Sequence, residues 1–198
     1  MKMAKKFLAV ALAGVLALSV LTGCGASVKS KDVADALTKM GVKVEQSDEM
    51  DKTAEDTLNA IEAIINSETN TGADKITLDN AVKMSDGKII KINNATDSNF
   101  NYAVKKALGL CAYNDSNATA AQKENITKNV KVALVKTENA TKDASLQAAL
   151  VKDGLVPVHN VVPTANTVYA ESGKLGSAKT RDGKYILVVI VTDLVTKS

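Results

Sequence analysis

Few side chains in this sequence could perform acid–base or nucleophilic chemistry. His159 is the only histidine, and Cys24 and Cys111 are the only cysteines. His159 could act as a general base or a metal ligand, although a hydrogen-bonded or solvent-facing residue at a strand edge is the simpler interpretation. Cys111 lies between two apolar residues and fits a small buried side chain. Zinc needs three or four Cys, His or acidic ligands. We therefore expect no metal site, no cofactor and no catalytic residue besides the candidate His159.

Two acidic segments and one arginine are candidate binding residues. The run of carboxylates from Asp48 to Asp56 could bind a cation, but acids at a helix entrance also favour the N-terminal dipole. Asp97–Asn101 begins like a calcium loop, yet the glycine and glutamate of an EF-hand do not follow it. Arg181, the only arginine, could grip a carboxylate. A solvated turn residue is the simpler interpretation of Arg181.

The first 24 residues carry the clearest pattern. Three lysines precede a largely apolar run from Phe7 to Leu21, and Thr22-Gly23-Cys24 follows. A basic segment, a short apolar segment and small residues before a cleavage point are typical of an export signal. A membrane-spanning helix needs about 20 apolar residues, which is longer than this run. We predict a signal peptide over residues 1–23, with a simple secretory signal as the alternative to a lipoprotein signal.

The segment Leu21-Thr22-Gly23-Cys24 resembles the lipobox of bacterial lipoproteins. The resemblance implies cleavage before Cys24, a diacylglycerol on its thiol and acylation, for example with palmitate, of the new amino terminus. Two or three acyl chains hold a protein stably on a membrane. The implied location is extracytoplasmic, anchored to the bacterial cell membrane by the N-terminal lipid. Residues 24–30 would then be the lipidated cysteine and a short tether.

The charge balance limits the kinds of partner. Residues 1–23 hold three lysines and no acid, so 22 basic and 22 acidic residues remain after them. This neutral balance argues against nucleic acid and against electrostatic docking to anionic lipid. The expected partner is the membrane, through the lipid on Cys24. An envelope protein or a small ligand is a further possible partner.

The first half of the domain has helical periodicity. Ser30 is predicted to cap a helix that ends before Gly41. Thr53 is predicted to cap the longest helix, with Asp56 reaching back to it. The predicted elements of this half are helices at 31–40, 54–65, 100–108 and 119–127, extended segments at 42–44 and 88–92, and a helix or strand at 75–84.

The second half has more strand signals. Segment 130–134 alternates apolar and other residues, which predicts a half-buried strand. Two prolines in and after segment 156–162 predict an edge strand. Asp182-Gly183 predicts a type I′ hairpin, and the wholly apolar segment 185–191 predicts a central strand with both faces covered. A helix marked by Leu146, Ala149 and Leu150, closed by Gly154, completes the predicted elements.

Several short segments resemble the CAP (cysteine-rich secretory, pathogenesis-related) fold. Ala36–Val42 and Met50–Ala54 resemble its opening, and His159–Pro163, Gly176–Ala178 and Asp182–Tyr185 resemble its end. The cleft of that family carries two histidines and two acids, and only His159 could match one of them here. The resemblance implies a member with a degenerate cleft, a binder more than an enzyme.

These patterns combine into one prediction. We expect a single compact α+β domain over residues 31–198, with helices mainly in the N-terminal half and a mostly antiparallel sheet in the C-terminal half. The leading hypothesis is a lipid-anchored, non-enzymatic envelope protein that binds a partner or ligand. The alternatives are an envelope enzyme that uses His159 and a divergent CAP-like domain.

Overall fold

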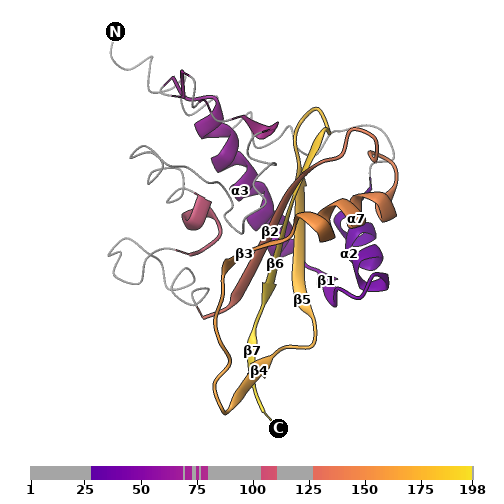
Figure 1. The fold of residues 1–198 in the computed structure, drawn as a ribbon, viewed down its shortest axis with the longest axis vertical. Coiled ribbons are helices and arrows are strands. Elements are labelled where there is room, and N and C mark those ends of the chain that lie inside the picture. Colours follow the sequence, from indigo (N-terminus) through magenta and orange to yellow (C-terminus); the bar gives the residue numbers. More distant parts are fainter. Residues whose placement is uncertain are drawn as a thin grey trace.

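The computed structural model describes residues 28–68, 70–72, 75, 77–79, 104–110 and 127–197. It has the predicted α+β class (Figure 1). In chain order the elements are α2 (Ser30–Lys39), β1 (Val44–Gln46), α3 (Asp48–Ile65), β2 (Asn129–Lys136), α7 (Ala144–Gly154), β3 (Val156–His159), β4 (Thr167–Tyr169), β5 (Gly173–Lys179), β6 (Tyr185–Thr192) and β7 (Leu194–Thr196). The predictions for 1–24, 80–103, 111 and 119–126 lie outside the described residues.

The main sheet has the strand order β1-β5-β6-β2-β3. The β5–β6, β6–β2 and β2–β3 pairs are antiparallel, and only the short β1 pairs in parallel, with β5. This confirms the predicted central position of the apolar segment 185–191, now β6, and the predicted edge position of β3. The edge position of β3 suits Pro157, which has no N–H to donate to a neighbouring strand.

Helices cover both faces of this sheet (Figure 1). Alternate residues of β6 point to opposite faces, so Leu187 and Val189 pack with α3 whereas Ile186 and Val188 pack with α2 and α7. All four of these side chains are fully buried. Burying apolar side chains of this size stabilises the fold by about 1.5–3 kcal/mol each. Because β6 contributes buried side chains to both hydrophobic cores, it lies at the centre of both.

The ends of the first two helices follow from local chemistry. Gly41 has a φ of 87°, and the N–H of Val42 donates to Leu37 O, as in a Schellman motif that ends α2. The prediction for α3 was wrong at its start: Ser47 is the N-cap and the acidic segment forms the first turn. Carboxylates stabilise a first turn through the helix dipole, and this outweighed the capping-box pattern at Thr53.

The predicted buried faces of β2 and α7 differ from those in the structure. The strand β2 is buried on both faces, because Ala133 and Val135 pack against the α2 and α7 side while Val132 packs against α3. In α7 the buried residues are Gln147, Ala148 and Val151, whereas Leu146 is 43% exposed. The helix was therefore predicted correctly and its buried face was not.

The β5–β6 hairpin is present, but its turn differs from the predicted type. A type I′ turn needs positive φ at both central residues. Only Gly183 has one (71°), since no described non-glycine residue has a positive φ. The N–H of Gly183 donates to Thr180 O, which closes a turn around Arg181 and Asp182. The positive φ of Gly183 therefore lies at the last residue of the turn, just before the chain enters β6.

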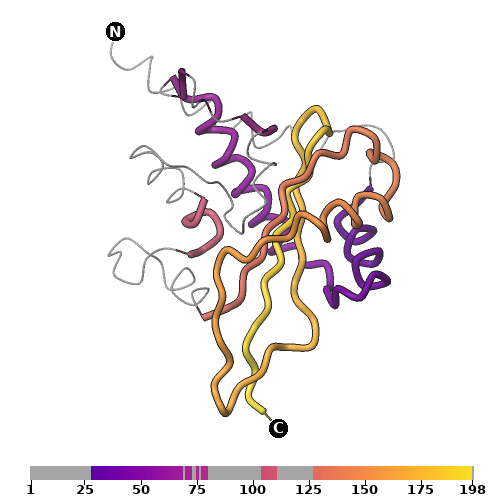
Figure 2. The backbone as a smooth tube through the Cα atoms, in the orientation of Figure 1, coloured from indigo at the N-terminus to yellow at the C-terminus, as the bar shows by residue number. Residues whose placement is uncertain are grey.

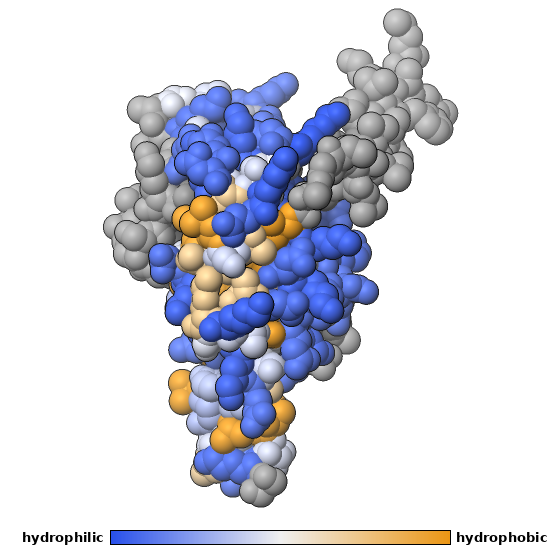
Figure 3. All heavy atoms as spheres, turned by 90° about the vertical axis from the view of Figure 1, so that its right-hand side faces the viewer, coloured by the Kyte–Doolittle hydropathy of each residue, from blue (hydrophilic) through white to orange (hydrophobic). Residues whose placement is uncertain are grey.

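A two-stranded arm extends from the main sheet. The tube trace shows β6 continuing into β7 beyond the main sheet, where β4 pairs with it (Figure 2). Val168 and Val195 face each other across this ribbon and are 38% and 43% exposed. Hydrophobic atoms are visible among polar ones on this narrow lower part of the molecule (Figure 3).

The helix α3 lies very close to the sheet at Gly176 of β5. A Cβ atom at this position would overlap the backbone of Met50 and Asp51 in α3. Only glycine therefore allows α3 to lie this close to the strand. A backbone cannot move aside in the way a flexible side chain can.

The first prediction concerns this contact. Gly176→Ala is expected to lower the free energy of unfolding by about 3 kcal/mol, the upper part of the range for overpacking, because the added methyl meets backbone. The measurement is urea denaturation followed by circular dichroism. Lys174→Ala, at an exposed position of the same strand, is the control and should change stability by no more than about 0.5 kcal/mol. Equal unfolding midpoints for Gly176→Ala and the wild type would contradict the prediction.

Candidate functional site

The candidate residues from the sequence do not meet in one place. His159 ends β3, where it is half-buried and opposite Val130 of β2. Arg181 is exposed in the β5–β6 loop, as expected for a turn residue. The carboxylates from Asp48 onward lie in the first turns of α3. Because β6 and β2 separate β5 from β3, the acidic segment beside β5 and His159 lie at opposite edges of the sheet.

Cys24, Asp97–Asn101 and Cys111 lie outside the described residues. Within the residues that are described, no group of three or more His, Cys, Asp or Glu side chains is arranged to hold a metal ion. The sequence candidates therefore supply no assembled centre in the described part of the chain.

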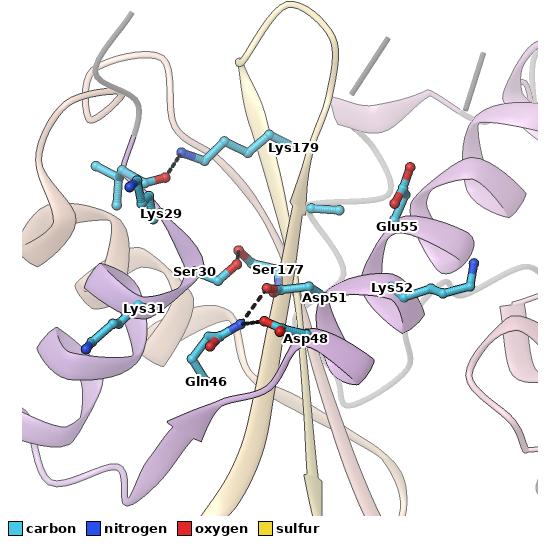
Figure 4. A pocket seen from close by; sticks show the side chains of 12 residues that line it. Lys29, Ser30, Lys31, Gln46, Asp48, Asp51, Lys52, Glu55, Ser177 and Lys179 are labelled. Atoms are coloured by element: carbon cyan, nitrogen blue, oxygen red, sulfur yellow. Dashed lines mark hydrogen bonds between the residues drawn. The ribbon is translucent and has the colours of Figure 1, made fainter. Parts of the chain in front are cut away.

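A polar groove lies where the short strand β1 ends and β5 continues (Figure 4). Its volume is about 660 Å³, within the usual range for ligand sites. The N-terminal part of α2 forms one wall and the first turns of α3 form the other. The lining residues are Val28, Lys29, Ser30, Lys31, Gln46, Asp48, Asp51, Lys52, Glu55, Ser177, Ala178 and Lys179.

Asp51 joins the α3 wall to the floor of the groove. Its Oδ1 accepts a hydrogen bond of 2.8 Å from the backbone N–H of Ser177, and its Oδ2 accepts one of 2.8 Å from Gln46 Nε2. The same Gln46 nitrogen also donates to Asp48 Oδ1 at 2.8 Å. Ser47 N–H makes the last backbone bond to β5, at Leu175 O. The carboxylate of Asp51 therefore replaces the backbone partner that β1 no longer supplies.

The α2 wall is joined to the floor by two contacts. The hydroxyl oxygens of Ser30 and Ser177 are 2.6 Å apart. Lys179 Nζ donates to the carbonyl oxygen of Val28 at 2.6 Å. The predicted tether over residues 24–30 therefore extends too far, because Val28, Lys29 and Ser30 belong to the folded domain. Val28 is 8% exposed.

The two walls differ in charge. Lys29, Lys31 and the half-buried Lys179 lie on the α2 side, whereas Asp48, Asp51 and Glu55 lie on the α3 side (Figure 4). Lys52 also lines the α3 side, but its ammonium is 3.2 Å from Asp56 and this pair is largely exposed. Burial lowers the pKa of Lys179, and the nearby Asp32 partly offsets this effect. The groove therefore places opposite charges on its two sides.

This arrangement can bind polar groups, but its described residues do not form a catalytic set. A serine nucleophile needs a base within hydrogen-bond reach. Here the hydroxyl partner of Ser30 is another hydroxyl, on Ser177, and the ammonium of Lys179 bonds to a backbone carbonyl. Hydrogen bonds and ion pairs to a ligand are the interactions that the groove offers.

Sequence reasoning missed this groove. It is formed by three segments far apart in the chain, around residues 28–31, 46–55 and 177–179. Each residue type is ordinary at its own position. The one partial signal was the acidic segment at residues 48–56, which lies in the α3 wall.

No protein-family model, curated protein or solved structure matches this chain. Among the helices that the structure describes, none is both long enough and apolar enough to span a bilayer.

The second prediction tests the role of Asp51. Asp51→Ala leaves the Ser177 N–H without its acceptor and removes one of the two bonds from Gln46 Nε2, so it should lower the free energy of unfolding by about 1–3 kcal/mol. Asp48→Ala is the matched control. It removes one exposed bond to Gln46 and should cost less than about 1 kcal/mol. Urea denaturation compares the two variants, and equal losses would refute a special role for Asp51.

The third prediction concerns Glu62, farther along α3. Burial, and secondly the negative charge of Asp182, raise the pKa of its carboxyl above 4.5. A raised pKa in the folded state gives stability that is present below pH 4.5 and lost as pH rises through the raised value. Glu62→Gln removes this loss.

The urea midpoint of Glu62→Gln should therefore increase relative to the wild type between about pH 4 and about pH 7. Glu45→Gln, at an exposed position on β1, is the control for the removal of one negative charge. A midpoint difference for Glu62→Gln that is constant over this range would show that the carboxyl is not perturbed as described.

Proposed function

We propose that this chain is a lipid-anchored, extracytoplasmic protein of the bacterial cell envelope, and that its domain binds a partner or ligand without enzymatic activity. The observation that carries the proposal is the sequence Leu21-Thr22-Gly23-Cys24 after a basic and apolar leader. Lipid on Cys24 would attach the domain to the membrane. The groove between α2 and α3 is the surface at which we propose binding.

Two observations support binding over catalysis. The groove has basic side chains on its α2 side, acidic side chains on its α3 side and hydroxyl groups from Ser30 and Ser177. Its volume is that of a ligand site. The candidate base His159 lies at the other edge of the main sheet from this groove. The neutral charge balance of residues 24–198 further favours a protein or small ligand over nucleic acid.

The fourth prediction tests the anchor. In a bacterial host, the wild-type chain should incorporate radiolabelled palmitate and sediment with membranes. Cys24→Ala should lose the label, because the acylated thiol is absent, and should leave the membrane fraction or remain uncleaved. Cys111→Ala is the matched control and should keep both properties. An unlabelled, soluble wild-type chain would overturn the proposal.

The alternative hypothesis, an envelope enzyme that uses His159, is separated by a different measurement. A hydrolytic activity found in a broad substrate panel, and abolished by His159→Ala without a change in circular dichroism, would overturn the non-enzymatic proposal. The non-enzymatic proposal expects identical, background-level rates for the wild type and this variant.

A further inference from the structure

The floor of the groove is a strand edge. Backbone hydrogen bonds alternate in direction along β5: Gly173 N–H and Leu175 O bond toward β1, whereas Thr180 N–H bonds toward β6. Ser177 N–H, which follows the first set, bonds to Asp51. The same alternation directs Lys179 N–H and the carbonyls of Ser177 and Lys179 outward, beyond the end of β1.

Within the described residues, neither the Lys179 N–H nor the Ser177 and Lys179 carbonyl oxygens have a hydrogen-bond partner. Unpaired N–H and C=O groups along a strand edge form a template for another strand. Ser177 and Lys179 line the groove, whose volume is within the range of ligand sites, and they follow the last β5 residue that pairs with β1. The unpaired backbone groups of this edge are suited to bind the backbone of an extended peptide.

The charges on the two walls determine which side chains of a bound peptide would be favoured. Successive side chains of a strand point to opposite faces of a sheet, and here one face is bordered by α2 and the other by α3. A strand added to β5 would therefore point alternate side chains toward Lys29 and Lys31 on one side and toward Asp48 and Glu55 on the other. Charge complementarity requires acidic residues in one alternate set and basic residues in the other.

We propose that the outer edge of β5 receives an extended peptide of alternating acidic and basic residues as an added strand in line with β1. This inference rests on the proposed binding function of the groove and names its ligand class. Backbone pairing gives affinity, and the alternate side chains give specificity, as in other cases of strand addition. Asp51 limits the added strand, because it already occupies the Ser177 N–H.

The test uses the full-length chain in detergent and a fluorescein-labelled octapeptide of alternating Glu and Lys. Its control is a peptide with the same composition in two blocks, four Glu followed by four Lys. Fluorescence anisotropy should show at least about tenfold tighter binding of the alternating peptide, because the block peptide places like charges on both walls. Equal affinities would overturn the proposal.

Two methylated peptides test backbone pairing independently of charge. In a strand, alternate N–H groups point to opposite edges. N-methylation of all Glu amides, or of all Lys amides, should therefore abolish binding in one peptide and leave the other within about threefold of the parent. The sensitive set also gives the direction of the added strand. Equal effects of both sets would overturn strand addition.

A pair of protein variants tests the edge itself. Lys179→Ala keeps the outward N–H and loses the ammonium, while Lys179→Pro loses both. Proline is tolerated where an edge N–H faces outward. Lys179→Pro should bind the alternating peptide at least about tenfold more weakly than Lys179→Ala. If circular dichroism shows that Lys179→Pro does not fold, the methylated peptides test strand addition in its place. If no peptide binds an acylated chain, strand addition is wrong but the proposed membrane anchor is unaffected. If the peptide binds in the groove and methylation of its amides has no effect, strand addition is wrong but the proposed binding function of the groove is unaffected.

Discussion

The close approach of α3 to β5 at Gly176 is the constraint on which the edge of the sheet depends. Because this position has no Cβ, the backbone of Met50 and Asp51 lies directly against the strand. Asp51 can then reach the N–H of Ser177 and take the place of a continuing β1. The short parallel strand ends at Gln46, the chain turns into α3, and the rest of the β5 edge is left beside a groove. One missing side chain thus determines both the packing of a core helix and the position of the candidate site.

The fold could be predicted wherever the signal is local. The segment 185–191 carries apolar side chains on both faces, which are stable only when both faces are buried, and it forms the central strand β6. Gly41 ends α2 because glycine, which lacks a Cβ, adopts the left-handed backbone conformation without a steric penalty. Predictions failed where two local signals competed or where packing decided. Ser47 and the acids after it outweighed Thr53 as the start of α3, and the buried face of α7 depends on the sheet it meets, which no period within the helix reveals.

The site could not be predicted, for a physical reason. A strand edge becomes a groove only when one neighbour stops and two helices border the gap. Those conditions depend on the lengths of β1 and on the contact at Gly176, and they join Val28 to Lys179 across most of the chain. His159 is chemically distinctive in the sequence, yet the sheet order places it at the far edge from the groove. Residues of ordinary type, such as Ser177 and Asp51, form the groove through their position alone.

The proposed anchor and the proposed groove constrain each other. Val28 follows Cys24 by four residues, and four residues of extended chain span at most about 14 Å. An acylated Cys24 would therefore hold the Val28 end of the groove close to the bilayer surface. A strand added through a few backbone bonds gives modest affinity in solution. Partners confined to the same membrane meet at a raised effective concentration, so a weak pairing of this kind is sufficient there. The geometry thus favours partner segments that are themselves close to the membrane surface.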